Sequence, residues 1–267
     1  MIYTSVDFDG RQAADYTLLV QVGEHQHALA VLDDEQQLKF AASYDPSQAE
    51  EEIADILNLD FGKVKLAVSD SQYTFIPVEV FDEAQTYTYL RFIQDDGMGE
   101  PLVTDIAPLE LKLLHQTSRI GVAPLETRFP QLCSYPAVQS LLCGAANYGK
   151  DVDGPLLIID KQRSRTTICF FDSGKFIYSN DFEIAHVDDL TYYLLVVLHH
   201  LGIADNQPLL CISGDVTEGD EYHRRMLAYG RQVVWADSGV LTGIGVPIEL
   251  MPHQHRFLTL LGLNLCG

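Results

Sequence analysis

Positive charge is scarce in this sequence. Its 267 residues hold 17 Lys and Arg against 38 Asp and Glu, which gives a formal net charge of −21 at pH 7. A surface that negative repels the phosphate backbone of nucleic acids and the anionic headgroups of membranes. The composition therefore predicts neither a nucleic-acid partner nor a membrane partner.

Cysteines at recognised spacings are also lacking. No Cys-x-x-Cys occurs, and the number of cysteines is odd: Cys133, Cys143, Cys169, Cys211 and Cys266. Most of them have apolar neighbours, so we expect reduced, buried thiols that pack as small apolar side chains. The spacing predicts neither a disulfide framework nor a zinc site.

Long apolar runs are absent as well. Runs such as residues 192–198 (YYLLVVL) are far shorter than the roughly 20 residues that cross a membrane. Residues 1–9 (MIYTSVDFD) lack the basic stretch and apolar core of a signal peptide. With 47% hydrophobic and 21% charged residues, the composition is typical of a globular protein. We expect a cytoplasmic protein of one large domain or two ordinary ones.

Apolar periodicity and turn residues predict the elements of the first half. Residues 1–15 are polar, and we expect them to be loose, while Pro46 and Ser47 supply a helix start. The pattern then predicts strands over 16–23, 27–32 and 37–44, a helix over 46–57, strands over 63–69 and 73–77, a helix over 79–94, a loop over 94–99, strands over 102–106 and 109–116, and helices over 125–129 and 137–147.

The pattern then restarts. Residues 149–155 (GKDVDGP) are polar, with two glycines and a proline, and predict a linker. After it the sequence predicts strands over 156–160, 166–172 and 175–180, a helix over 187–201, a strand over 209–213, a helix over 221–229, a strand over 232–237 and a helix over 255–263. We therefore divide the chain into two halves, residues 1–150 and 151–267.

A constant offset relates the two halves. Asp172 lies 139 residues after Asp33, and this offset pairs residues 29–33 (LAVLD) with 168–172 (ICFFD). Three antiparallel strands, a helix and a parallel strand in each half indicate an internal duplication, and this order resembles the ribonuclease-H-like α/β unit. Two such units in tandem resemble the actin, sugar-kinase and heat-shock-70 ATPase superfamily. The expected fold class is α/β, with duplicated ribonuclease-H-like units in an actin-like ATPase fold.

Four short motifs extend the resemblance over nearly the whole chain. They are LLVQVG (18–23), YTFIP (73–77), YLRF (89–92) and TYYL (191–194). With these motifs the chain resembles the bacterial family known as domain of unknown function 3822, found mainly in Bacteroidetes. The resemblance implies an actin-like ATPase fold and no established activity. The layout is also similar, more loosely, to the actin-like adaptor of type IV pilus assembly.

The superfamily resemblance implies where a nucleotide would bind, in the cleft between the halves. Active members carry Asp-x-Gly at the first hairpin of each half. The aspartate serves Mg²⁺ or acts as a base, and the glycine lets backbone N–H groups approach the phosphate. The offset sets Gln21-Val22-Gly23 against Asp160-Lys161-Gln162. The first half therefore keeps the glycine without the carboxylate, and a neutral Gln21 cannot replace a carboxylate beside Mg²⁺.

Active relatives also carry a glycine-rich adenosine loop after a strand of the second half. Here residues 213–221 (SGDVTEGDE) hold two separated glycines and four acidic side chains. Carboxylates beside a triphosphate are unfavourable unless a metal intervenes. Lys161, Arg163 and Arg165 nevertheless place a basic hairpin tip where a phosphate-gripping turn would lie. This tip is either an anion-capturing turn or a solvated turn that keeps a strand edge soluble.

The candidate cofactor-binding residues are Gln21, Gly23, Asp160, Lys161, Arg163, Gly214 and Asp215. Near the two histidine pairs, 25 with 27 and 253 with 255, no Cys or Glu completes a recognised metal-ligand spacing, so we expect surface histidines and no metal site. Residues 239–245 (GVLTGIG) precede no clear helix and are expected to be a loop.

Three functions remain open from the sequence. The degraded hairpin motifs favour a non-catalytic adaptor or scaffold without a cofactor, bound to a protein partner or to copies of itself. The aromatic segment 87–92 would offer it a partner surface. The alternative is an atypical ATPase or small-molecule kinase that uses ATP and Mg²⁺ through Gly23, Asp160 and the Gly214 loop. A third possibility is a subunit that completes a composite site with another chain.

Overall fold

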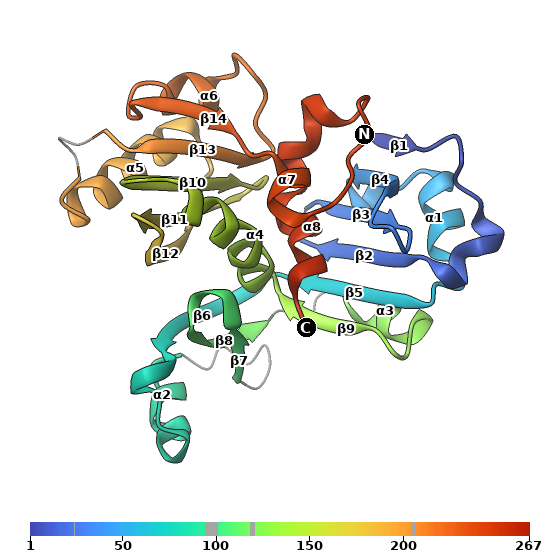
Figure 1. Cartoon of the computed structure of the whole chain (residues 1–267), viewed down its shortest axis with the longest axis horizontal. Coiled ribbons are helices and arrows are strands. Elements are labelled where there is room, and N and C mark those ends of the chain that lie inside the picture. Colours follow the sequence, from blue (N-terminus) through green and yellow to red (C-terminus); the bar gives the residue numbers. More distant parts are fainter. Residues whose placement is uncertain (24, 94–100, 118–120, 204–206) are drawn as a thin grey trace.

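The computed structural model describes residues 1–23, 25–93, 101–117, 121–203 and 207–267 (Figure 1). The strands within these residues form three sheets. Two large sheets stand on either side of a central pair of helices, and the third sheet forms an arm that projects from them (Figure 1). None of the helices in the described ranges is both long and apolar enough to span a membrane.

The first large sheet has the strand order β1-β4-β3-β2-β5-β9. Strands β2, β3 and β4 form an antiparallel meander, and β5 and β9 add to it in parallel. Its strands are β1 (Ile2–Thr4), β2 (Thr17–Val22), β3 (His27–Leu32), β4 (Leu38–Tyr44), β5 (Lys63–Val68) and β9 (Cys133–Pro136), with α1 (Glu51–Leu57) between β4 and β5.

The second large sheet has the order β12-β11-β10-β13-β14. Its elements are β10 (Pro155–Lys161), β11 (Arg165–Asp172), β12 (Lys175–Glu183), α5 (Val187–His200), β13 (Leu209–Gly214), α6 (Glu221–Met226) and β14 (Gln232–Trp235). The start of α5 is fixed by Asp189, whose carboxylate accepts a hydrogen bond from the backbone N–H of His186 at 2.7 Å.

The two sheets repeat one topology. The order β4-β3-β2-β5-β9 has the same connectivity as β12-β11-β10-β13-β14. Leu18 faces Val31 in the first hairpin and Leu157 faces Phe170 in the second, so both partners differ by 139 residues. The predicted offset is therefore the register that relates the two hairpins, and it sets Gln21 opposite Asp160.

Each large sheet is buried on both faces, which explains its continuous apolar strands. In β2, Leu18 and Val20 belong to the cluster beneath α1, whereas Leu19 belongs to a cluster with C-terminal residues such as Leu260. In β10, Leu157 and Ile159 pack toward α5, and Leu156 and Ile158 pack toward α4 (Ala137–Asp151).

The inner helices cross over between the halves. Helix α4 follows the first sheet but packs on the second, whereas α7 (Ser238–Thr242) and α8 (Leu258–Gly262) follow the second, and α8 packs on the first. The helices meet where the Ser140 hydroxyl donates a 2.5 Å hydrogen bond to the carbonyl of Thr259. Gly262 permits this approach, because a Cβ there would lie 2.2 Å from the carbonyl oxygen of Ser140.

The linker predicted over residues 149–155 is wrong for its first three residues and for its last one. Helix α4 continues to Asp151, and β10 begins at Pro155. Gly149 is a packing residue, since a Cβ at this position would meet the Phe171 ring at 2.7 Å. The glycine that resembles a linker residue in the sequence therefore serves close packing.

The arm is built on the third sheet, of order β6-β8-β7, with α2 near its tip (Figure 1). Its elements are β6 (Asp70–Pro77), α2 (Thr86–Leu90), β7 (Leu102–Ile106) and β8 (Leu111–Thr117), and α3 (Ala123–Arg128) leads back to β9. The helix predicted over 79–94 is wrong in extent. Asp82 caps a separate turn by accepting from the backbone N–H of Ala84 at 2.9 Å, so α2 covers only five residues. The loop expected over 94–99 lies outside the described residues.

Three further expectations need correction. Residues 1–15 are not loose, since they contain β1 and a 3₁₀-helix (Gly10–Asp15) whose Ala13 is buried. Residues 239–245 include most of α7, which Asp237 caps through the backbone N–H of Val240. The helix expected over 255–263 is divided between a 3₁₀-helix (Met251–Phe257) and α8.

Candidate functional site

Two hairpin turns mark the candidate site, one from each large sheet. In the first turn, the backbone N–H of Gly23 donates to the carbonyl of Gln26 at 3.1 Å. A Cβ on Gly23 would lie 2.8 Å from that carbonyl oxygen, so the turn requires glycine. Gln21, two residues earlier in β2, is half-buried and lies opposite Ala67 of β5. The position equivalent to Asp160 in the first sheet thus carries a neutral amide in place of a carboxylate.

Asp160 lies at the equivalent place in the second sheet, but it is buried, with 3% of its surface exposed. Its carboxylate accepts hydrogen bonds from Ser213 Oγ at 2.7 Å, Thr259 Oγ1 at 3.0 Å and Gln162 Nε2 at 2.9 Å. Burial raises the pKa of Asp160, and these three donors oppose the rise. Asp160 therefore joins β10 to β13 and to α8 through its own side chain.

Lys161 does not point into solvent, contrary to the expectation of a basic tip. It is 3% exposed, and its ammonium donates to the carbonyls of Gln162 and Arg163 in its own turn. The ammonium also lies 4.6 Å from the centre of the Tyr222 ring. Burial lowers the pKa of Lys161, while Asp215 and Asp220 oppose this. The lysine closes its own turn.

Arg163 connects the two turns directly. Its Nη1 lies 3.0 Å from Asp45 Oδ2 and donates to the carbonyl of His25 at 3.3 Å. Hydrogen bonds from Ser47, followed by the one from Arg163, lower the pKa of Asp45 to about 2. The guanidinium of the second half is therefore engaged by the first half, at the place where the resemblance puts the phosphates. Arg165, the third basic residue, pairs with Asp181 at 3.3 Å.

Gly214 is the last residue of β13, and Asp215 begins the turn that follows it. Gly214 has φ +84°, and a Cβ there would lie 2.2 Å from the carbonyl oxygen of Lys161. The backbone N–H of Asp215 donates to that same carbonyl, and its carboxylate lies 3.6 Å from the guanidinium of Arg256. This turn is thereby attached to the hairpin on one side and to the C-terminal segment on the other.

His255 is buried, so its expected place on the surface is wrong. Its Nε2 lies 3.0 Å from the carbonyl oxygen of Val216, and its ring centre lies 4.5 Å from that of Trp235. Burial lowers the pKa of His255. Within the described ranges, no group of three or more His, Cys, Asp or Glu side chains could hold a metal ion.

The structure brings together Asp160, Lys161, Gly214 and Asp215, which occupy adjacent ends of β10 and β13. Gln21 and Gly23 belong to the other sheet, and Arg163 bridges toward it. Sequence reasoning missed Thr259 and Asp45 as partners of this cluster. A threonine within an otherwise apolar run (FLTLLGL) could have indicated a buried polar contact for Thr259. No local pattern pairs Asp45 with Arg163, which is 118 residues away.

Several solved structures superpose on nearly the whole of this chain. A Bacteroides thetaiotaomicron protein, described as having an actin-like ATPase fold and unknown function, superposes with a TM-score of 0.74 at 15% identity, covering 97% of this chain and 99% of that one. The PilM-PilN type IV pilus biogenesis complex matches with a TM-score of 0.67 at 13% identity, covering 93% and 97%. The ethanolamine utilization protein EutJ of Carboxydothermus hydrogenoformans matches with a TM-score of 0.50 at 13% identity, covering 94% and 90%.

These likenesses establish the fold and confirm the fold class expected from the sequence. Comparison with curated proteins finds no significant match. A family model described as "Protein of unknown function (DUF3822)" matches residues 5–233 of the chain. The resemblance noted in the sequence motifs is thereby confirmed, and the chain belongs to the DUF3822 family.

Proposed function

We propose that this protein is a non-catalytic adaptor or scaffold with an actin-like ATPase fold. The observation that carries the proposal is the contact of Arg163 with Asp45 and with the carbonyl of His25. It connects the two turns that would have to separate around a phosphate. A nucleotide would have to displace an ion pair and a hydrogen bond before it could enter.

The carboxylates do not fit a Mg²⁺–nucleotide site. Gln21 supplies no charge, and Asp160 already accepts from three side chains in a buried position. Mg²⁺ requires carboxylate or water oxygens in a nearly ideal octahedral arrangement. A metal at Asp160 would take the acceptor of the Thr259 hydroxyl and leave Ser213 with the carbonyl of His255 alone, which is unfavourable for buried hydroxyls. We therefore propose that the protein works without ATP and Mg²⁺.

The equal registers of the two hairpins support an origin by duplication, with a division near residues 150 and 151. The division applies to the sheets, because α4 and α8 each pack on the sheet of the other half. Crossed helices would hold the two halves in one arrangement, and a rigid body of this kind suits a scaffold.

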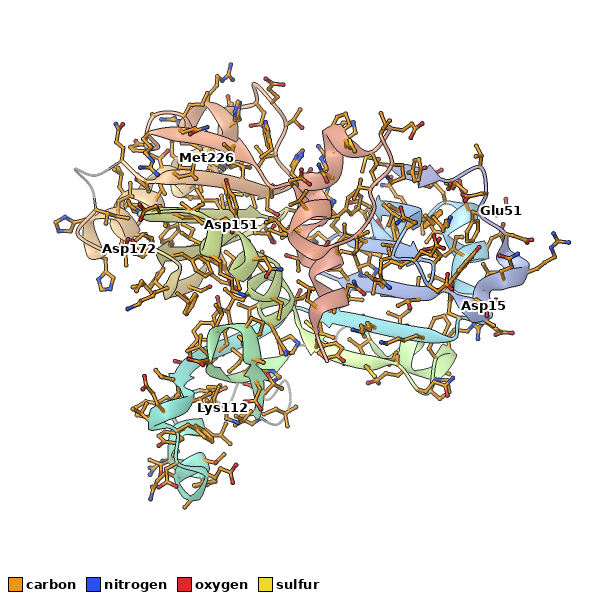
Figure 2. All side chains as sticks on the ribbon, in the orientation of Figure 1. Asp15, Glu51, Lys112, Asp151, Asp172 and Met226 are labelled. Carbon is orange, nitrogen blue, oxygen red and sulfur yellow. The ribbon has the colours of Figure 1, made fainter. Side chains whose placement is uncertain are left out.

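The arm is the surface that we propose for a protein partner. Several large apolar side chains of this region are exposed, among them Tyr87 at 81% and Phe92 at 77%. Residues 70–117 also hold nine Asp and Glu against two Lys and Arg. Figure 2 shows the arm, with Lys112 labelled, standing apart from the side chains that fill the two large sheets. Exposed aromatic side chains in an acidic setting favour a partner that is both basic and apolar.

A thermal melt with and without millimolar ATP and Mg²⁺ tests the proposal. We expect no shift in the melting temperature. A nucleotide at a hundred times its Kd would add about 2.7 kcal/mol, or roughly 5–10 °C. A rise of that size that Gly23→Val and Asp160→Ala remove would establish the alternative, an atypical ATPase or small-molecule kinase.

The partner surface needs a separate test. Proteins retained from native extract by the wild-type chain are compared with those retained by Tyr87→Lys. A matched control is Tyr192→Lys on α5, where the side chain is 63% exposed but lies outside the arm. We expect Tyr87→Lys alone to lose a specific partner. Equal retention by all three proteins would contradict the assignment of the arm.

A further inference from the structure

Two buried cysteines meet at the junction between α4 and the C-terminal segment. Cys143 lies in α4, and Cys266 follows the 3₁₀-helix Leu263–Leu265. Their sulfur atoms are 4.0 Å apart, and the residues are 3% and 2% exposed. Both thiols are free, and they come from positions separated by 123 residues.

A buried lysine lies beside this thiol pair. Lys65 of β5 is 5% exposed, and its ammonium donates to the carbonyls of Leu263 at 3.0 Å and of Cys266 at 2.5 Å. The ammonium thus fixes the segment that carries Cys266. The hydrogen bond from Cys266 lowers the pKa of Cys143, burial opposes this shift, and the positive charge of Lys65 adds to the lowering. A thiolate is the reactive form of cysteine, so this setting favours Cys143 as the nucleophile.

We propose that Cys143 and Cys266 are an oxidation site at which a peroxide closes an intramolecular disulfide. The Cys143 thiolate attacks one peroxide oxygen, the O–O bond breaks, and Cys143 becomes a sulfenic acid while hydroxide leaves. The sulfur of Cys266 then attacks the sulfenic sulfur and displaces its hydroxyl group. The two protons lost by the thiols leave with the displaced oxygens. One peroxide is reduced to two waters, and two thiols are oxidised to one disulfide.

Formation of the disulfide requires a small movement of Cys143 and Cys266 toward each other. The sulfur atoms must approach from 4.0 Å to about 2 Å, the length of a disulfide bond. Helix α4 packs on the second sheet, and the C-terminal segment with α8 packs on the first. The bond would therefore fix the contact between the crossed helices that hold the two halves together.

The remaining cysteines provide internal controls. Cys169 and Cys211 both pair with Ile158, from the strands on its two sides. Two strand spacings separate them by about 9–10 Å, which is too far for a disulfide. Cys133 is exposed on β9 and lies opposite Lys65 in the sheet, so it is the thiol that could compete for Cys266.

The test exposes the full-length protein to hydrogen peroxide and identifies linked peptides by mass spectrometry without reduction. Cleavage after Leu142 separates Cys143 from Cys133, so the wild-type protein alone can assign the bond. We expect a Cys143–Cys266 peptide, an intact mass lower by two hydrogens, and reversal by dithiothreitol. A melting temperature higher by up to about 10 °C should accompany the bond.

Variants then distinguish a specific Cys143–Cys266 disulfide from general oxidation of the cysteines. Cys133→Ser and Cys169→Ser should retain the linked peptide, and Cys143→Ser should lose both the peptide and the rise in melting temperature. A free Cys266 after peroxide treatment, a bond from Cys266 to Cys133, or conversion to sulfinic acid without a disulfide would each overturn the proposal.

Discussion

The hairpins of the two large sheets share one register but differ in how their ends are stabilised. The first ends in a glycine turn, in which Gly23 donates to Gln26, and its Gln21 is only half-buried. The second ends in side-chain contacts, with Asp160 and Lys161 both buried and fully engaged. The same backbone therefore carries an open polar position in one half and a structural network in the other. Two sheets with the same topology therefore use the equivalent positions Gln21 and Asp160 for different roles.

Substitution at the two equivalent positions gives the largest expected difference. Asp160→Ala removes the acceptor of the Thr259 hydroxyl and of the Gln162 amide, while Ser213 keeps the carbonyl of His255, and it should lower the free energy of unfolding by about 3 kcal/mol. Gln21→Ala removes a half-buried side chain and should cost under about 1 kcal/mol. Urea denaturation of both variants measures the difference. Equal losses would contradict the contrast between the two positions.

The second comparison concerns the ends of the parallel strands β5 and β13. Val68 in β5 lies opposite Val22, and Gly214 in β13 lies opposite Lys161, so Val68 and Gly214 hold equivalent positions in the two sheets. Gly214→Ala should cost about 2–3 kcal/mol, because the methyl group meets a carbonyl and the residue keeps a positive φ. Gly219 is the matched control, since its φ is +79° but no atom lies within 4 Å of its Cβ position. Gly219→Ala should cost only about 1 kcal/mol. A Gly214→Ala variant no less stable than the control would remove the argument for a steric requirement.

The sequence predicted more of the fold than of the site. Apolar runs such as residues 28–32 predicted the strands, and the offset of 139 fixed the equivalence of the hairpins. The site depends on contacts between distant residues. Whether Asp160 is buried is decided by the place where α8 packs, and Thr259 lies 99 residues away. Local patterns carry no signal for such contacts.

Short or atypical elements were missed for a related reason. Strand β9 (Cys133–Pro136) has four residues and ends in proline, so neither length nor alternation distinguishes it from a loop. It is a strand because β5 pairs with it along Lys65 to Val68. Tertiary context determines the structure of such segments more than their own residues do.

A pH series would sharpen the comparison in a second way. Because burial raises the pKa of Asp160 above 3.8, the native state keeps its proton where the unfolded state has lost it. Stability from this group therefore falls as the pH rises above about 4, through the native pKa. The difference in unfolding free energy between wild type and Asp160→Asn should decline over that range.

His255 is a second buried titratable group, and it changes the pH dependence of stability in the opposite direction. Burial lowers its pKa, so its contribution is lost as the pH falls below 6.5, the opposite direction. The histidine is present in both proteins, and its effect cancels in their difference. A difference that is independent of pH would show that Asp160 titrates like an exposed carboxyl.

The smallest expected effect concerns the contact between the two turns themselves. The side chains of Arg163 and Asp45 are 57% and 34% exposed, so Arg163→Ala should lower the unfolding free energy by under about 1 kcal/mol. The loss should shrink in 1 M salt, because exposed ion pairs are screened. Arg165→Ala is the matched control, since its partner Asp181 is more buried and does not belong to the first half. If Arg163→Ala, but not Arg165→Ala, gains a melting-temperature response to ATP and Mg²⁺, the bridge alone keeps the nucleotide out. Without such a response, the differences at Gln21 and Asp160 are sufficient to abolish nucleotide binding.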